Sequence, residues 1–120
     1  VADEARYFAH FTSGAVFLGT DDSERWNMEQ FRAYAHPHFA EGRGWTYVPG
    51  DRHVTLASDG TLAWFDEKLH SDKYGELRGT GVLRRIGGTW KLAQYSMTFV
   101  VPNDATQGVV ERIRAPAAAP

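Results

Sequence analysis

The sequence predicts an α+β fold in which helices near the N-terminus pack on one face of an antiparallel sheet. Up to about residue 40 the apolar residues recur at helical spacing, and beyond it they alternate with a period of two, as in strands. Two hairpin signals, Asp59-Gly60 and Gly87-Gly88, separate alternating segments, because type I′ turns need positive φ at both central positions. A run of helices followed by a meander of strands is typical of this fold class.

The first helix and the first strand are expected before residue 20. Residues 2–11 place Ala5, Phe8 and Phe11 at helical spacing and carry acids early, which favours a short helix. The glycine of "TSGAV" then indicates a helix end, and residues 15–18, "AVFL", predict a short buried strand.

A second helix is expected to open at Asn27. Asn27 followed three residues later by Gln30 is a capping-box pattern. Pro37 is expected to break or restart this helix, because proline lacks the backbone N–H. One face of the helix carries Phe31, Tyr34, Ala35, His38 and Phe39.

The remainder of the chain predicts strands and a short terminal helix. Pro49-Gly50 is expected to interrupt the first long strand as a bulge or bend. A helix is expected over 104–114, residues 1–114 form a single domain, and residues 115–120 are expected to be a flexible tail. The strands are expected at residues 45–48, 52–57, 61–69, 76–85 and 90–101.

Composition excludes several classes of function. The 120 residues carry a net charge of −2 with acids and bases interspersed, so a nucleic-acid partner is not expected. The absence of cysteine excludes disulfides, thiolate nucleophiles and cysteine-type zinc sites. No apolar run approaches membrane-spanning length and the N-terminus lacks a signal pattern, so we expect a cytoplasmic protein without a membrane partner.

Apolar residues on both faces of the sheet predict a homodimer. Residues 61–69 carry bulky apolar side chains on both alternation sets, and residues 90–99 repeat this pattern. An antiparallel sheet in a monomer usually has one wet face, so helices are expected on one face and a partner subunit on the other. The alternative is a sheet so curved that its own ends cover both faces.

Several segments together resemble the SnoaL-like branch of the nuclear transport factor 2-like superfamily. They are "RYFAHFTSGAVFLGTDDSERW", "EQFRAYAHPHFA", "GWTYVPGDRHV", "DGTLAWFDE", "GTGVLRR" and "GGTWKLAQYSMTFVVPND", which together span residues 5 to about 104. The resemblance implies a cone, namely a strongly curved antiparallel sheet wrapped around N-terminal helices, with a pocket inside and a dimer interface on the outer sheet face. Family members usually have a longer first helix, and only its end precedes Arg6-Tyr7-Phe8 here.

The resemblance also implies which residues line the pocket. It turns the alternation set of Trp64 and Asp66 toward the cavity and Glu67 outward. A mostly aromatic pocket with one acid suits a neutral or cationic small molecule, and no cofactor is expected. The expected pocket residues are Trp26, Phe31, Tyr34, His38, Trp45, Trp64, Asp66, Arg78, Tyr95 and Met97.

Asp66 is the candidate catalytic residue, and it has a purely structural alternative. A buried carboxylate resists ionisation unless a cation or hydrogen-bond donors are nearby, so Asp66 needs a partner in the pocket. The structural interpretation is that Asp66 pairs with Arg78 or Lys68 across the sheet.

The histidines and the glycine-rich segment do not indicate a metal or phosphate site. His36 and His38 are two residues apart on a helix and point in different directions, so no metal is expected. His38 is either a neutral donor in the pocket or a satisfied core residue. Gly79 and Gly81 lie inside a strand and open no helix, so they are expected to let the sheet bend.

Two classes of function fit these features. The first is a dimeric cone that binds a small, partly apolar molecule. The second is an isomerase, cyclase or dehydratase that transfers a proton through a pocket carboxylate. The resemblance places an isomerase base at the end of the first strand, where this chain has Leu18-Gly19-Thr20, so the matching positions do not support isomerase activity.

Overall fold

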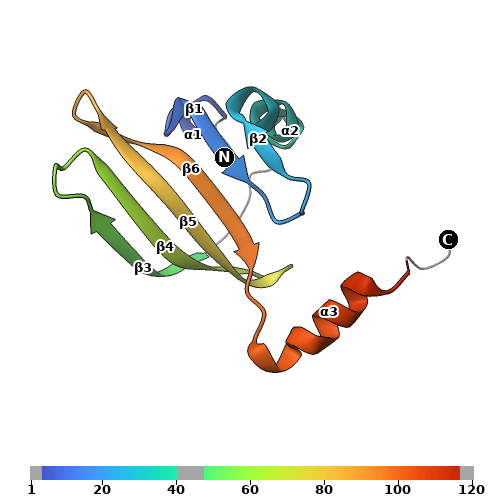
Figure 1. The fold of residues 1–120 in the computed structure, drawn as a ribbon. Helices are drawn as coiled ribbons and strands as arrows, with labels where there is room; N and C mark the ends of the chain where they lie inside the picture. The colour runs from blue at the N-terminus through green and yellow to red at the C-terminus, as the bar shows by residue number, and fades with distance from the viewer. Residues whose placement is uncertain (1–3, 41–47, 117–120) are drawn as a thin grey trace.

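A computed structural model describes residues 4–40 and 48–116, and side chains are described except at 38–40. Within these residues the chain folds into a curved, unclosed six-stranded sheet with three α-helices (Figure 1), which confirms the α+β prediction. The strand order is β2-β1-β6-β5-β4-β3. The elements are α1 (Glu4–Phe8), β1 (Phe11–Leu18), β2 (Arg25–Asn27), α2 (Met28–Ala40), β3 (Val48–Leu56), β4 (Leu62–Ser71), β5 (Gly75–Ile86), β6 (Thr89–Phe99), a 3₁₀ turn η1 (Asn103–Ala105) and α3 (Thr106–Arg114).

The N-terminal segment differs from its prediction. The first helix ends at Phe8, and Phe11 begins β1 instead of closing the helix. The long-range bond from the Leu92 amide to the His10 carbonyl, at 2.7 Å, draws the chain into a parallel pairing of β1 with β6. Tertiary pairing therefore overrides the local helical pattern, and the sheet is mixed and not purely antiparallel.

The second helix begins as predicted but does not break at its proline. The Asn27 amide donates to Gln30 Oε1 at 2.9 Å, and the Gln30 amide donates to Asn27 Oδ1 at 2.8 Å, which is a reciprocal capping box. The helix continues through Pro37 to Ala40. Pro37 lies near the C-terminal end, where the loss of one hydrogen bond does not stop the last turn from forming.

The three hairpin and strand-break predictions had different outcomes. Gly87 and Gly88 both have positive φ, which confirms a type I′-like turn between β5 and β6. At the β3–β4 hairpin only Gly60 has positive φ, so the predicted type I′ turn is wrong there. The register of β3 with β4 shifts between Gly50 and His53, which confirms the bulge expected after Pro49.

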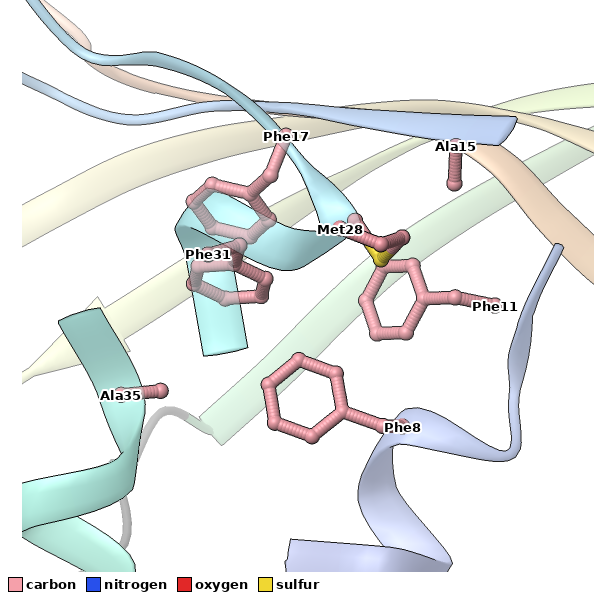
Figure 2. Close-up of a cluster of buried hydrophobic side chains, with 7 residues drawn as sticks. All are labelled: Phe8, Phe11, Ala15, Phe17, Met28, Phe31 and Ala35. Carbon is pink, nitrogen blue, oxygen red and sulfur yellow. The ribbon is translucent and has the colours of Figure 1, made fainter. Parts of the chain in front are cut away.

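The hydrophobic core lies between the helices and the β1 side of the sheet. Figure 2 shows its labelled side chains, in which the rings of Phe17 from β1 and Phe31 from α2 face one another. Their centroids are 4.1 Å apart with 14° between the planes, and Trp26 stacks on Phe31 at 5.8 Å. Aromatic pairs of this kind add about 0.5–1.5 kcal/mol beyond the area they bury. This stack fixes α2 over the sheet. The cluster comprises Phe8, Phe11, Ala15, Phe17, Met28, Phe31 and Ala35.

The two faces of the sheet differ in burial along β4. We call the face that the helices cover the inner face and the opposite one the outer face. Ala63, Glu67 and Leu69 are buried on the inner face, whereas Trp64 and Asp66 are exposed on the outer face. Side chains alternate in a strand, so the assignment of one residue fixes the whole set.

The C-terminal helix α3 extends away from the sheet in Figure 1. It buries no residue, and its apolar Val109 and Ile113 are exposed. Local bonds hold it, including one from Gln107 Nε2 to Glu111 Oε1 at 3.2 Å. None of the helices within residues 4–40 and 48–116 has the combination of length and hydropathy that crossing a membrane requires.

Candidate ligand site on the inner face

A buried carboxylate is the central polar group of the inner face. The Glu67 side chain is only 7% exposed. Its Oε1 accepts a hydrogen bond from Arg52 Nε at 2.7 Å and lies 2.7 Å from Arg52 Nη2, so the guanidinium binds this oxygen through two nitrogens. Its Oε2 accepts a hydrogen bond from the Tyr95 hydroxyl at 3.0 Å. These contacts satisfy the carboxylate, which would otherwise be costly to bury.

A bulge in β3 places Arg52 opposite Glu67. Gly50 pairs with Lys68 and His53 pairs with Asp66, so two residues of β3 oppose Glu67 alone. Asp51 has a φ of 42°, in the left-handed region. A bulge re-aims the side chain next to it, which here is Arg52, toward the inner face. The Arg52 side chain remains 55% exposed, so water and a ligand can reach it.

Two glycines of β5 make room for the large side chains of the site. A Cβ on Gly79 would collide with the Tyr95 hydroxyl and lie 3.3 Å from Glu67 Oε2. A Cβ on Gly81 would lie 2.5 Å from Phe65 Cε1. The sequence predicted that these glycines bend the sheet. What the structure shows is that they leave space for the Tyr95 and Phe65 rings.

Tyr95 connects the polar cluster to the aromatic core. Its ring lies 5.8 Å from Phe17 and 6.1 Å from Phe65. Burial, then the negative charge of Glu67 and the hydrogen bond to it, hold the pKa of Tyr95 well above its ordinary value near 10. The hydroxyl is therefore a neutral donor throughout the physiological range. The Tyr95 hydroxyl donates its proton to Glu67, and its oxygen can still accept a hydrogen bond from another group.

Five of the predicted pocket residues lie on or over the inner face. Phe31 and Tyr34 come from α2, and Trp26 stacks on both, with a centroid distance of 4.5 Å to Tyr34. Tyr95 belongs to the polar cluster, and Met97 shares its alternation set and pairs with Gly79.

The inward orientation predicted for Trp64, Asp66 and Arg78 is wrong. Trp64 is 49% exposed, and Asp66 and Arg78 are also exposed on the outer face. Asp66 forms no ion pair with Arg78 or Lys68 in the described part of the chain. Both alternation sets of β4 contain bulky apolar residues, so hydrophobicity alone did not distinguish them.

Two further predicted residues fall outside what the structure describes. Trp45 lies between residues 41 and 47, and the side chain of His38 is not among those described. His36 is exposed and contacts Glu4, with Nδ1 and Oε1 2.6 Å apart, which joins α2 to α1. Within residues 4–40 and 48–116, no three histidine or acidic side chains converge in a way that could hold a metal ion.

The sequence interpretation missed Glu67 and Arg52 as site residues. Parity places Glu67 in one alternation set with Ala63 and Leu69, but only their burial in the structure shows that this set faces inward. A usable signal was the Pro49-Gly50 bulge, which shifts the alternation of β3 and redirects Arg52.

The family comparison matches most of the chain. The model of the SnoaL-like domain matches residues 1–102. The chain belongs to the SnoaL-like domain family. The matched segment includes every strand of the sheet and the Glu67 cluster, whereas α3 lies beyond it.

Solved structures with the same fold are distant in sequence from this SnoaL-like domain. A nuclear transport factor 2-like protein of unknown function from Pseudomonas putida is 17% identical, with a TM-score of 0.62 over 86% of this chain and 77% of that one. A candidate ketosteroid isomerase from Parabacteroides distasonis is 18% identical, with a TM-score of 0.64 over 85% and 79%. A protein of unknown function with a cystatin-like fold, from Nostoc punctiforme, is 17% identical, with a TM-score of 0.63 over 84% and 78%. No curated protein matches the chain.

Substituting the two partners of the Arg52–Glu67 ion pair is expected to lower stability by different amounts. Arg52→Gln leaves the buried Glu67 without its cation, and we expect it to lower the free energy of unfolding by about 2 kcal/mol. Glu67→Gln leaves an arginine that water can solvate, and we expect a loss of about 1 kcal/mol. Asp66→Asn, on the outer face of the same strand, is the control and should change stability by less than about 0.5 kcal/mol. Urea denaturation of the three variants measures these differences, and a larger loss in Asp66→Asn would contradict the assignment of faces.

The raised pKa of Tyr95 predicts a loss of stability in alkali. The folded state keeps a proton that the unfolded state loses, so stability is full below the ordinary tyrosine value near 10 and falls as pH rises above it. One such group lowers the free energy of unfolding by about 1.4 kcal/mol for each pH unit above that value. Tyr95→Phe should therefore be less stable at pH 8, through the lost hydrogen bond, but should lose stability less steeply above pH 10. Urea denaturation at a series of pH values measures this. If the free energy of unfolding fell equally steeply above pH 10 in the variant and the parent, the prediction would be contradicted.

Proposed function

We propose that this SnoaL-like domain binds a small, partly apolar molecule on the inner face, with Glu67, Arg52 and Tyr95 as its polar anchor. The observation that carries the proposal is the polar cluster itself, in which a buried carboxylate holds a half-exposed guanidinium and a neutral hydroxyl beside aromatic rings. Binding sites for small molecules commonly combine apolar walls with a few fixed polar groups of this kind.

The apolar surface beside the anchor supports the proposal. Val54 pairs with Phe65 and Leu56 pairs with Ala63, so both belong to the inner set of β3. Both are exposed, because α2 covers the inner face only at its opposite edge, where it packs against β1 and β2. An apolar molecule seated here would remove their surface from water at about 25 cal/mol per Å².

The charges of the anchor favour a neutral ligand. Arg52 and Glu67 compensate one another, so neither a cation nor an anion finds an unpaired opposite charge in the cluster. The exposed N–H groups of Arg52 can donate to a carbonyl or hydroxyl of the ligand, and the Tyr95 oxygen can accept from a hydroxyl.

Proton-transfer catalysis is the second candidate, and the similarity to the fold of a candidate ketosteroid isomerase favours it. In this chain it would require Glu67 as the base and Tyr95 as the neutral donor, in place of Asp66. Both Glu67 oxygens already accept hydrogen bonds, so neither can take a proton from a ligand without losing one of these contacts. The geometry therefore supports binding better than catalysis.

A thermal-shift screen tests the binding function. We expect neutral, partly apolar compounds to raise the unfolding temperature, since a ligand at 100 times its Kd stabilises the folded state by about 2.7 kcal/mol. The shift should be lost in Glu67→Gln and kept in Asp66→Asn. Stabilisation by anions alone, or an unchanged response in Glu67→Gln, would contradict the proposal. Exchange of a ligand C–H proton in D₂O, dependent on Glu67, would instead establish the catalytic alternative.

We also propose a homodimer that forms through the outer face. Leu62 and Trp64 of β4 are exposed there, and Trp64 pairs with the half-buried Val82 of β5. A large exposed tryptophan flanked by aliphatic side chains is typical of a subunit interface.

Light scattering tests the dimer. We expect a dimer at micromolar concentration and a monomer for Trp64→Glu, because a charge would be buried at the interface. Ile113→Glu, on the exposed α3, is the matched control and should remain dimeric. A monomeric parent would exclude the dimer, and dissociation of Ile113→Glu alone would place the contact on α3.

A further inference from the structure

A pocket of about 360 Å³ lies between β1 and the β5–β6 hairpin. Thr12, Ser13 and Gly14 of β1 form one wall, and Arg84 and Lys91 form another. Ile86 contributes an apolar side chain. None of these residues belongs to the inner-face cluster, so the two sites are separate.

Two cations of this pocket lie directly opposite one another. Arg84 of β5 pairs in register with Lys91 of β6, and both side chains belong to the outer set. Neither forms an ion pair or a side-chain hydrogen bond within residues 4–40 and 48–116. Like charges directly opposite one another destabilise a sheet. Their positive potential is therefore uncompensated, and an anion between them would relieve the repulsion.

Thr12 supplies a hydroxyl without a partner. The residue is 9% exposed, and its side chain makes no hydrogen bond to any described residue. Among the described residues no enclosed side-chain oxygen or nitrogen lacks a partner, so the Thr12 hydroxyl reaches solvent at the pocket. Thr12 lines the pocket, and a ligand there can accept the proton of its hydroxyl.

The wall formed by Thr12, Ser13 and Gly14 lies at an irregularity in the pairing of β1 with β6. Phe11 pairs with Leu92 and Val16 pairs with Gln94, so five steps along β1 correspond to two along β6. The residues between have no register partner in β6. A Cβ built on Gly14 would meet no atom within 4 Å, so the wall is open at this point. Backbone excursions of this kind recur where a strand aims a side chain at a ligand.

We propose that this pocket binds the oxyanion group of a small organic anion, a carboxylate or a phosphate. Arg84 and Lys91 hold the charge, the Thr12 hydroxyl donates a hydrogen bond, and Ile86 contacts the apolar part of the molecule. Arginine suits the planar, two-oxygen geometry of carboxylate and phosphate, and lysine adds a point charge. This proposal does not depend on the function of the inner face.

NMR titration of the full chain tests the site with two probes, inorganic phosphate and butyrate, each against sodium chloride at equal ionic strength. We expect saturable shifts of the backbone amides of Thr12, Ser13 and Gly14 with at least one probe. Stronger binding of butyrate would assign a carboxylate with an apolar body, and stronger binding of phosphate would assign a phosphate group. Shifts that only follow ionic strength, with no saturation by either probe, would overturn the proposal.

Variants distinguish binding of the anion in the pocket from a general effect of positive charge on the surface. Arg84→Gln combined with Lys91→Gln should weaken binding at least tenfold, whereas Arg78→Gln, on the outer set of the same strand, should leave it unchanged. Thr12→Val removes only the hydroxyl and should weaken binding about threefold or more while the fold is kept. Equal losses in Arg78→Gln and in the double variant would overturn the proposal. Light scattering on each variant excludes a change of oligomeric state as the cause.

Discussion

Burial of the Glu67 carboxylate beside aromatic rings is the constraint that organises the inner face. A charge in such surroundings is stable only when cations and donors reach it, and here each oxygen has its own partner. Arg52 reaches Glu67 because β3 bulges at Asp51, and Tyr95 reaches it because Gly79 leaves the space above the sheet free. Two separate strands, β3 and β5, therefore adjust their local geometry to one side chain of β4.

The aromatic core performs a different task, which is to fix the helices relative to that cluster. Phe17 stacks on Phe31, and Tyr95 lies within ring contact of Phe17, so α2 is connected to the polar anchor through two rings. Rings have few rotatable bonds and pack in defined orientations, so this connection is stiff. The site is therefore bounded by strands β4 to β6 on one side and by aromatic rings on the side of α2.

Local signals in the sequence predicted much of this fold, and long-range pairing decided the rest. The capping box of Asn27 and Gln30 and the turn at Gly87-Gly88 depend on neighbours in the chain, so the sequence revealed them. The end of the first helix depends on a bond between His10 and Leu92, which no local pattern contains. The face of Glu67 was also unpredictable from hydrophobicity, since Trp64 and Phe65 give the two sets of β4 similar apolar content.

The same strand pair carries different chemistry on its two faces. On the inner face of β5 and β6, Gly79 and Tyr95 complete the Glu67 cluster, while on the outer face Arg84 and Lys91 lie opposite one another. Arg84 lies five positions after Gly79 along β5, which corresponds to about 17 Å at about 3.3 Å per residue. Effects of substitutions that far apart usually add, provided that the sites share no partner residues. No described contact joins Arg84 or Lys91 to Arg52, Glu67 or Tyr95, so substitutions on one face are expected to leave the other intact. A loss of binding that appears on both faces at once would therefore indicate a change in the sheet itself and not in either site.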